Sequence, residues 1–433
     1  MPRVPRSVLV QADDLLEPAS PSVLAASQVT ERVTWLFLAL YTLAFASTSL
    51  LLIAPLLVTL ALKVQELAGA TRAPASLALV ASIGALVAMV GNPFFGRMSD
   101  RTSSRFGMRR PWMLVGLLGG TAGILVVAVA PSIPLVVLGW CVAQLFFNAL
   151  LAAMVAVLPD QVPARQRGAV AGVLGVCTPV ASVSGTFLVQ LFAPDRLLMF
   201  LAPCAIGAVF ILLFMARLKD RRLASADRPA WSFREFASTF AFDPRRAPDF
   251  AWAFGSRFLF VLAYAFLATY EAYYLIEKLG TTPSDVPRQI FLATLLQSSA
   301  VVVASVVGGR ISDRTGRRKV FILTAAALYG VAMFVIAFAG GFGAFLVGVG
   351  IGGVAFGAYF AVDLALVADV LPDRRTLAKD LGVLNIAGAL PFSIAPAIAP
   401  ALLAIGGYAG LYSVAGAVAI LGAVAIIPVR RVR

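Results

Sequence analysis

The sequence contains no histidine and only three cysteines among its 433 residues. Without histidine, neither a His-Glu-x-x-His zinc motif nor a Ser–His–Asp triad can form. The cysteines all lie in apolar runs, where a free thiol behaves as a small buried hydrophobe; they are Cys141, Cys177 and Cys204. No lysine follows the glycine pattern of a phosphate-binding loop. We therefore expect a protein that is not an enzyme and has no resident metal or cofactor.

Charged side chains are also scarce. They make up 13% of the chain, whereas 60% of the residues are hydrophobic and the mean hydropathy is +0.92. A soluble globular protein has about 25% charged residues, so this composition excludes a soluble enzyme, a disordered chain and a secreted disulfide scaffold. Because one spanning helix needs about 20 consecutive apolar residues, the chain can supply about a dozen. The composition indicates an integral membrane protein that crosses the bilayer many times.

Long apolar runs predict an all-α integral membrane fold with twelve transmembrane helices. The expected spans lie near residues 34–62, 76–96, 111–130, 133–158, 169–192, 197–216, 250–275, 287–307, 320–339, 342–370, 381–402 and 407–428. The expected organisation is an N-terminal tail (1–33), a six-helix half (34–216), a linker (217–249), a second six-helix half (250–428) and a C-terminal tail (429–433). In the linker, Phe233, Phe236 and Phe240 follow helical spacing, which predicts an amphipathic helix on the membrane surface.

The basic residues fall almost entirely on one side of the predicted membrane. The two tails and the loops after even-numbered spans hold 29 of the 35 Lys and Arg residues. Five, including Lys63, lie in loops on the opposite side, and Arg257 lies inside a span. Positive charge in short loops marks the cytoplasmic side. We therefore expect a multi-pass cell-membrane protein with both termini in the cytoplasm, and the net charge of +14 does not indicate a nucleic-acid partner.

The sequence also repeats itself. Residues 96–102 read G-R-M-S-D-R-T and residues 309–315 read G-R-I-S-D-R-T, an offset of 213 positions. The tripeptide Leu-Pro-Asp at 158–160 recurs at 371–373 with the same offset. Two halves related by one translation indicate a duplicated fold with parallel halves.

The full first loop, G-R-M-S-D-R-T-S-S-R-F-G-M-R-R-P-W at residues 96–112, resembles the signature loop of the major facilitator superfamily. Its copy, G-R-I-S-D-R-T-G-R-R-K at residues 309–319, stands where that family repeats it. The resemblance covers all twelve spans and implies a secondary transporter that works by alternating access, with a cavity lined by the first and fourth spans of each half. The long first loop is most similar to that of the sucrose and glycoside–pentoside–hexuronide symporters, which implies a sugar or glycoside substrate.

The sequence departs from this symporter branch in its acidic residues. Symporters of the branch use carboxylates in the N-terminal half for cation coupling, and the first six predicted spans contain none. Sodium coupling is therefore not expected, and we predict a proton as the coupling ion. The expected partners are a small-molecule substrate, this proton and the lipid bilayer, and the chain is expected to act as a monomer.

The two copies of the signature loop hold a dense set of charges. A carboxylate just after a span's end can face arginines or the positive N-terminus of a helix, and the resemblance implies that this cluster latches a cytoplasmic gate. We expect gating for the two aspartates and topology anchoring for the outer arginines. The candidate gate residues are Gly96, Asp100, Arg101, Arg109, Arg110, Gly309, Asp313, Arg314, Arg317 and Arg318.

Ionisable residues at bilayer depth are costly and mark functional sites by default. Arg257 in the seventh span and Asp363 in the tenth are predicted at the same depth, about 10 Å from the cytoplasmic ends of their spans. We predict a pair that couples protonation or substrate binding to the conformational switch; the alternative is a purely structural pair. Glu271 lies among Tyr270, Tyr273 and Tyr274, which suggests an interfacial aromatic belt or, alternatively, a role in external proton entry.

Uncharged polar residues complete the predicted cavity. Gln144 and Asn148 share one face of the fourth span, as Tyr359 and Asp363 do in the tenth, and Asn385 lies in the eleventh. Such groups can bind sugar hydroxyls, although they also hold helices together in lipid.

The sequence thus favours a proton-coupled sugar or glycoside transporter. Efflux of a hydrophobic drug or metabolite is the alternative, and a receptor built on a transporter fold is a third possibility. The fifth span lacks the Gly-Pro and Gly-Gly pattern of many drug–proton antiporters of the superfamily, which favours uptake.

Overall fold

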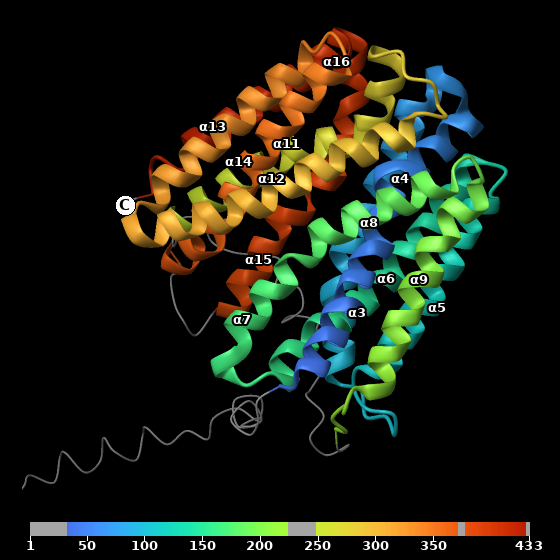
Figure 1. Cartoon of the computed structure of the whole chain (residues 1–433), viewed down its shortest axis with the longest axis vertical. Helices are drawn as coiled ribbons and strands as arrows, with labels where there is room; N and C mark the ends of the chain where they lie inside the picture. Colours follow the sequence, from blue (N-terminus) through green and yellow to red (C-terminus); the bar gives the residue numbers. More distant parts are fainter. Residues whose placement is uncertain (1–32, 224–247, 371–376, 430–433) are drawn as a thin grey trace, which may run out of the picture.

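The computed structural model describes residues 33–223, 248–370 and 377–429, and this part of the chain is built from helices alone (Figure 1). In chain order the elements are α3 (Trp35–Ala54), the π-helical turn η2 (Pro55–Thr59), α4 (Leu60–Asp100), α5 (Arg110–Val129), α6 (Ile133–Gln161), α7 (Ala164–Gly175), α8 (Cys177–Phe192), α9 (Arg196–Arg217), α11 (Pro248–Tyr273), the π-helical turn η4 (Tyr274–Lys278), α12 (Val286–Thr315), α13 (Arg318–Ala337), α14 (Phe342–Val370), α15 (Leu377–Ala389) and α16 (Pro391–Ala425). An all-helical architecture satisfies every backbone hydrogen bond within the apolar bilayer.

The first long helical segment reverses direction at Gly69. Its φ of 72° is accessible to glycine at little cost. The Tyr41 hydroxyl near the start of α3 donates to the carbonyl of Met154 near the end of α6, and Arg109 links the end of α4 to the end of α6. The start of α3 and the end of α4 therefore lie at the same end of the bundle, so this segment crosses the membrane twice.

The last long helix reverses in the same way at Gly407, where φ is 57°. A Cβ placed on Gly388 would lie 3.6 Å from the Arg257 guanidinium, and one on Gly422 would lie 3.2 Å from the carbonyl of Ser256. Both sides of the reversal thus pack near the start of α11. Ten segments of the described chain are long and apolar enough to span a membrane, and the two reversals bring the crossings to twelve. The predicted number of spans is confirmed.

The boundaries differ from the prediction in three places. The second crossing begins directly after Gly69 and continues to Asp100 rather than spanning 76–96. The fifth crossing is divided into α7 and α8 at Val176, and the eleventh into α15 and α16 at Leu390. Lys63 lies within α4 and is buried rather than in a loop. Apolar runs mark the hydrocarbon layer, whereas a helix continues beyond it as long as its backbone and packing contacts persist.

The helices form two groups of six crossings. Figure 1 shows the blue-to-green helices α3 to α9 on one side and the yellow-to-red helices α11 to α16 on the other. We call them the first half and the second half. The end of the bundle where α4 ends and α5 begins is called the motif end, and the opposite end is called the far end. The two halves are the two predicted repeats.

The halves meet at the far end. The Tyr273 hydroxyl of α11 donates to the carbonyl of Ala61 in α4 at 2.9 Å, and the Tyr270 hydroxyl lies 3.2 Å from the carbonyls of Pro74 in α4 and Pro396 in α16. The rings of Phe187 at the end of α8 and Phe291 at the start of α12 are 5.6 Å apart. These contacts hold the two halves together on the side opposite the signature loop.

Close packing inside each half relies on small residues. A Cβ on Gly116 of α5 would lie 2.6 Å from the backbone nitrogen of Leu150 in α6, and one on Gly330 of α13 would lie 2.9 Å from the carbonyl of Gly416 in α16. Helices in lipid gain most of their association energy from such close approach. These contacts fix the distances between the helices that carry the polar groups described below.

Two predictions concern residues outside the described part of the chain. The amphipathic helix predicted around Phe233, Phe236 and Phe240 falls in 224–247, and the second Leu-Pro-Asp tripeptide falls in 371–376.

Candidate functional site

The predicted pair between α11 and α14 is present. Nη1 of Arg257 lies 2.6 Å from Oδ2 of Asp363, and the two side chains are 16% and 3% exposed. Asp363 lies seven residues before Val370, the last residue of α14, which is about 10 Å at the helical rise. The sequence predicted this pairing. The pair is a charge–charge contact inside the second half, near the motif end.

Aromatic rings enclose this pair. The Arg257 guanidinium lies 5.5 Å from the ring centroid of Phe360, and Tyr359 stacks on Phe260 at 3.9 Å with an interplanar angle of 6°. Such surroundings exclude water and strengthen the Coulomb attraction between the paired charges. Nε of Arg257 is buried without a hydrogen-bond partner among the described residues. The guanidinium is thus held mainly by Asp363, so neutralising that carboxylate would remove its principal partner.

Tyr359 lies beside the pair rather than in an open cavity. Its ring is buried, and its hydroxyl is 3.5 Å from Oγ of Ser256, the residue that precedes Arg257. Asn385, by contrast, is exposed on α15. The sequence grouped both as candidate cavity residues; the structure brings Tyr359 to the pair, and the contacts of the pair do not include Asn385.

The polar residues of α6 form a separate cluster. The side-chain nitrogen of Asn148 donates to the carbonyl of Gln144 at 2.8 Å and to its Oε1 at 3.2 Å. Nδ2 of Asn92 in α4 donates to Oδ1 of Asn148 at 3.4 Å. Both α6 side chains are buried, and their contacts join α4 to α6. Asn92 was not singled out from the sequence, although it is an amide inside an apolar run and therefore carried a signal.

The surroundings of Glu271 differ from the predicted aromatic belt. Tyr270, Tyr273 and Tyr274 are all fully buried, and each hydroxyl donates to a backbone carbonyl. Tyrosines of an interfacial belt would expose their hydroxyls to water and headgroups, so that interpretation is wrong. Neighbouring positions on a helix face different directions. Here the Tyr270 and Tyr273 hydroxyls reach the first half, whereas the Tyr274 hydroxyl lies in the core of the second half. Glu271 itself is 8% exposed.

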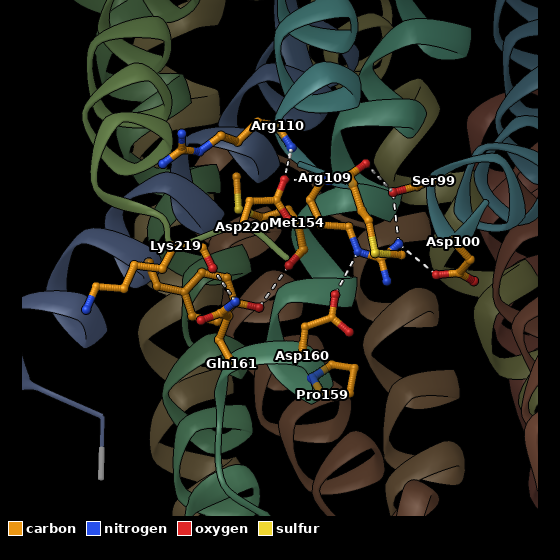
Figure 2. Close-up of polar contacts among 12 residues, drawn as sticks. Ser99, Asp100, Arg109, Arg110, Met154, Pro159, Asp160, Gln161, Lys219 and Asp220 are labelled. Atoms are coloured by element: carbon orange, nitrogen blue, oxygen red, sulfur yellow. Dashed lines mark hydrogen bonds and ion pairs between the residues drawn. The ribbon is translucent and has the colours of Figure 1, made fainter. Parts of the chain in front are cut away.

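The first signature loop is organised around one arginine (Figure 2). Nη1 of Arg109 lies 2.7 Å from Oδ1 of Asp100 and 2.9 Å from Oγ of Ser99, and its Nε lies 2.7 Å from Oδ2 of Asp160. Burial lowers the pKa of the Arg109 guanidinium, but the hydrogen bonds and charges of Asp160 and Asp100 outweigh it and raise the pKa above its usual value. Arg109 therefore joins the ends of α4 and α6, a more specific role than the predicted topology anchor.

The short segment after α9, residues 218–221, is hydrogen-bonded to this loop. Oδ2 of Asp220 accepts hydrogen bonds from the backbone N–H groups of Arg109 and Arg110 at 2.7 and 2.8 Å, which caps the start of α5. The Arg110 side chain donates to the carbonyl of Leu218, and the N–H of Met108 donates to the carbonyl of Arg221 at 3.0 Å. Figure 2 shows Asp220 lying against the Arg109–Arg110 backbone. No local sequence pattern indicates this role of Asp220.

The second signature loop is shorter. Helix α12 continues through Gly309 to Thr315, Gly316 adopts a φ of 66°, and α13 begins at Arg318. Arg314 and Arg317 are exposed, whereas Arg318 is half-buried. The side chain of Asp313 lies outside the described part of the chain, so its predicted gate role stays a prediction.

The first glycine of each signature loop packs against an alanine of the fourth crossing in its own half. A Cβ on Gly96 would lie 4.0 Å from the Cβ of Ala152 in α6, and one on Gly309 would lie 3.9 Å from the Cβ of Ala361 in α14. In both halves the second crossing therefore approaches the fourth at the motif. Arg101, which follows the first motif, is half-buried after the end of α4.

A cavity of about 330 Å³ lies in the first half, toward the motif end. Its walls come from α3, α6, α7 and α8, and they are mostly apolar. The lining residues are Tyr41, Phe45, Val155, Leu158, Ala171, Leu174, Gly175 and Thr178.

A family model described as Major Facilitator Superfamily matches residues 36–282 and 253–433. The chain belongs to this superfamily. The match covers both halves, in agreement with the duplicated fold. It does not distinguish branches of the superfamily, so the narrower resemblance to the sucrose and glycoside symporters stays a prediction.

Solved transporters share the fold of this superfamily member. A variant of the nucleoside transporter NupG aligns with a TM-score of 0.72 at 13% identity, over 91% of this chain and 99% of that chain. The peptide transporter POT aligns with a TM-score of 0.72 at 12% identity, over 94% and 98%. A D-xylose–proton symporter aligns with a TM-score of 0.66 at 14% identity, over 92% and 97%. At these identities the likeness shows the fold alone.

One curated relative is more similar in sequence but over a shorter length. The multidrug resistance protein MdtL of Klebsiella pneumoniae subsp. pneumoniae is 36% identical over 97 residues, which cover 22% of this chain and 24% of that protein. The chain thus matches about a quarter of the length of this relative.

Proposed function

We propose that the protein is a secondary active transporter that moves a small molecule together with a proton by alternating access. A sugar or glycoside is the first candidate substrate, supported by the resemblance of residues 96–112 to the loop of sugar and glycoside symporters. The observation that carries the coupling proposal is the buried contact between Arg257 and Asp363. A buried ion pair inside a membrane bundle contributes little to stability relative to apolar packing, which favours a role in function.

The proposed coupling step uses the chemistry of this pair. While Asp363 is ionised, it holds the Arg257 guanidinium between α11 and α14. A proton on Asp363 would neutralise the carboxylate and free the guanidinium, whose Nε has no other partner among the described residues. A substrate hydroxyl can then accept a hydrogen bond from the released guanidinium. Proton binding and substrate binding would thus favour the same rearrangement of α11 against α14.

The proposed conformational cycle follows from where the halves touch. They are joined at the far end through Tyr270 and Tyr273. Near the motif end, α7 has open space beside Gly168, Gly172 and Gly175, since no described atom lies within 4 Å of a Cβ placed there. With the motif end in the cytoplasm, as the positive-inside pattern favours, we propose that this arrangement is an inward-facing state.

The topology and organisation belong to the same proposal. We place both termini in the cytoplasm of a cell-membrane protein, with the half boundaries at 34–216 and 250–428, and we take the monomer as the working unit. The residues proposed to line the transport path are Arg257, Asp363, Glu271, Tyr359, Gln144, Asn148 and Asn385.

Uptake into proteoliposomes tests the proposal. The purified protein is offered a panel of labelled sugars and glycosides with and without an inward proton gradient. We expect at least one sugar to accumulate only with the gradient and to be lost when a protonophore is added. No gradient-dependent uptake of any sugar would contradict the sugar assignment.

Efflux of a hydrophobic compound is the second candidate. It is favoured by the apolar cavity against Tyr41 and Phe45, and by the partial similarity to a multidrug resistance protein. Lipophilic cations in the same panel separate the two: proton-driven movement of these compounds, without sugar uptake, would establish efflux and displace the sugar proposal.

A further inference from the structure

The interior of the second half holds a polar cluster away from the Arg257–Asp363 pair. Glu271 of α11 is 8% exposed, and Tyr329 of α13 and Tyr412 of α16 are fully buried. The ring of Tyr412 lies 5.2 Å from that of Tyr274, which follows Glu271 by three residues, and both Tyr329 and Tyr412 are close enough to Glu271 for their charges to interact. The close approach of α13 and α16 at Gly330 and Gly416 lies next to Tyr329 and one turn from Tyr412. Three crossings of the same half thus direct ionisable side chains to one place.

Two hydroxyls of this cluster have unused hydrogen-bonding capacity. The hydroxyl oxygens of Tyr329 and Tyr412 are buried without a hydrogen-bond partner among the described residues. The neighbouring Tyr274 is equally buried, yet its hydroxyl donates to the carbonyl of Ile336 at 2.7 Å. A buried hydroxyl without a partner costs about 1–3 kcal/mol. The orphan groups therefore point to a ligand that the cluster shares.

The chemistry of the cluster fits a proton. An ionised carboxylate can accept hydrogen bonds from phenols that turn toward it, and a protonated one can donate a hydrogen bond of its own. Hard metal cations take about six oxygen ligands, whereas the groups that face Glu271 are the phenols Tyr264 on its own helix, Tyr329 on α13 and Tyr412 on α16. One carboxylate and three phenols supply fewer oxygens than such a cation requires.

Further phenols lie between the cluster and the far end. The Tyr408 hydroxyl donates to Oε2 of Glu277 at 2.9 Å, and Glu277 is exposed. The ring of Tyr274 lies 5.2 Å from that of Tyr412 and 5.7 Å from that of Tyr408, so the phenols of α16 and η4 are packed together. Packed phenol rings thus lie between the exposed carboxylate of Glu277 and the buried cluster.

The opposite direction is closed by an apolar ring. Phe260 lies 5.0 Å from Tyr329 and 3.9 Å from Tyr359, measured between ring centroids, so it stands between the cluster and the residue beside Asp363. Phenylalanine carries no proton, and its ring excludes water. Glu271 and Asp363 are therefore separated in this conformation, Glu271 toward the far end and Asp363 toward the motif end.

We propose that Glu271, Tyr329 and Tyr412 form a proton-binding site inside the second half, loaded from the far end through Tyr408 and Glu277. The site rests on the proposed proton-coupled transport and extends it by naming where the proton first binds. Rearrangement of α11 in the transport cycle would then bring this proton into contact with the Arg257–Asp363 pair.

Infrared titration of the purified protein tests the site without requiring transport. The carbonyl band of a protonated buried carboxyl group is followed against pH in sodium-free detergent solution. We expect E271Q to remove one titrating band. Y329F and Y412F should move its midpoint to higher pH by about one unit, because each removes a hydroxyl that has no partner among the described residues and can turn to donate to the carboxylate when it ionises. Y274F is the matched control, since it removes a buried hydroxyl already bonded to Ile336, and it should leave the midpoint unchanged.

Three outcomes would overturn the site. E271Q could leave every band in place, Y274F could shift the midpoint as much as Y412F, or added sodium could displace the proton and so identify a cation site. Failure of the transport proposal is distinguishable: a band assigned to Glu271 in a protein whose transport ignores the proton gradient would contradict coupling while the site stands. In proteoliposomes, E277Q should reduce the response of uptake to the pH at the far end several-fold and leave the infrared band of Glu271 in place.

Discussion

At the scale of single residues, Arg109 is the residue of the signature loop whose loss should cost the most stability. Its guanidinium is buried while its partners Asp100 and Asp160 are partly exposed. Replacement by alanine removes both ion pairs and the bond to Ser99. Because loss of one partner of a buried pair costs about 3–5 kcal/mol and exposure of the carboxylates reduces this, we expect a loss of about 2 kcal/mol.

Thermal unfolding in detergent measures this effect. R109A should lower Tm clearly, R109K should lower it less, and R105A, which removes an exposed arginine of the same loop, should leave it unchanged. Equal Tm values for R109A and R105A would show that the buried arginine only anchors topology.

Gly107 provides a second residue-scale prediction. Its φ is 104°, and a Cβ there would lie 2.2 Å from Oδ2 of Asp220, the atom that caps α5. G107A should therefore displace Asp220 and destabilise the loop by about 1–3 kcal/mol. G168A is the control, since α7 has open space at that position. A Tm for G107A equal to that of G168A would show that the contact of Asp220 with the loop does not contribute to stability.

Among single residues, the sequence was most informative for a charge that had few possible partners within the predicted spans. Arg257 and Asp363 were predicted to pair because they lie at the same depth in two spans that the family resemblance places side by side. The three tyrosines around Glu271 were misassigned because adjacency along the chain does not say which neighbour each face meets. Asp220 was missed because its partners lie 110 and 111 positions away in the chain.

At the scale of elements, the pair between α11 and α14 separates a structural role from a coupling role. The double variant R257D/D363R exchanges the charges across the same two helices. We expect Tm to recover to near that of the parent, compared with either single variant, because the attraction is restored. Proton-driven accumulation should stay at least about tenfold lower, since the proton would now have to neutralise a carboxylate on the other helix. Recovery of both properties would assign the pair a purely structural role.

Hydrophobic runs predicted the elements well because the bilayer imposes their length. The reversals at Gly69 and Gly407 are single-residue turns. Around Gly69 the helix continues through the polar residues Lys63, Glu66 and Arg72, so the apolar runs end before the helices do. The breaks at Val176 and Leu390 lie inside apolar sequence and depend on packing. The length of an apolar run therefore does not predict them.

At the scale of the whole molecule, the hydroxyls of Tyr270 and Tyr273 hold the far end closed. A typical hydrogen bond contributes about 1 kcal/mol, so Y273F should shift the equilibrium toward the far-end-open state about fivefold. Distances between spin labels placed on α8 and α12 near Phe187 and Phe291 would report it. Y274F, whose hydroxyl is bonded inside the second half, serves as the control. A shift of the same size in both variants would show that the far-end bonds do not control the equilibrium.

The duplicated six-helix architecture could be predicted because the loop motifs of the first half recur in the second half at an offset of 213 positions. The relation between the two halves could not, since the contacts at the far end depend on the conformational state as well as on the sequence. The buried cluster of Glu271, Tyr329 and Tyr412 likewise depends on how three distant helices pack.

The central claim is that Asp363 couples a proton to substrate movement. The most direct measurement is substrate accumulation in proteoliposomes under an inward proton gradient, for the parent protein and D363N, with D285N as a control at an exposed far-end carboxylate. We predict accumulation above equilibrium for the parent and D285N, and equilibration only for D363N. Accumulation by D363N to the level of the parent, with the same pH dependence, would contradict the account.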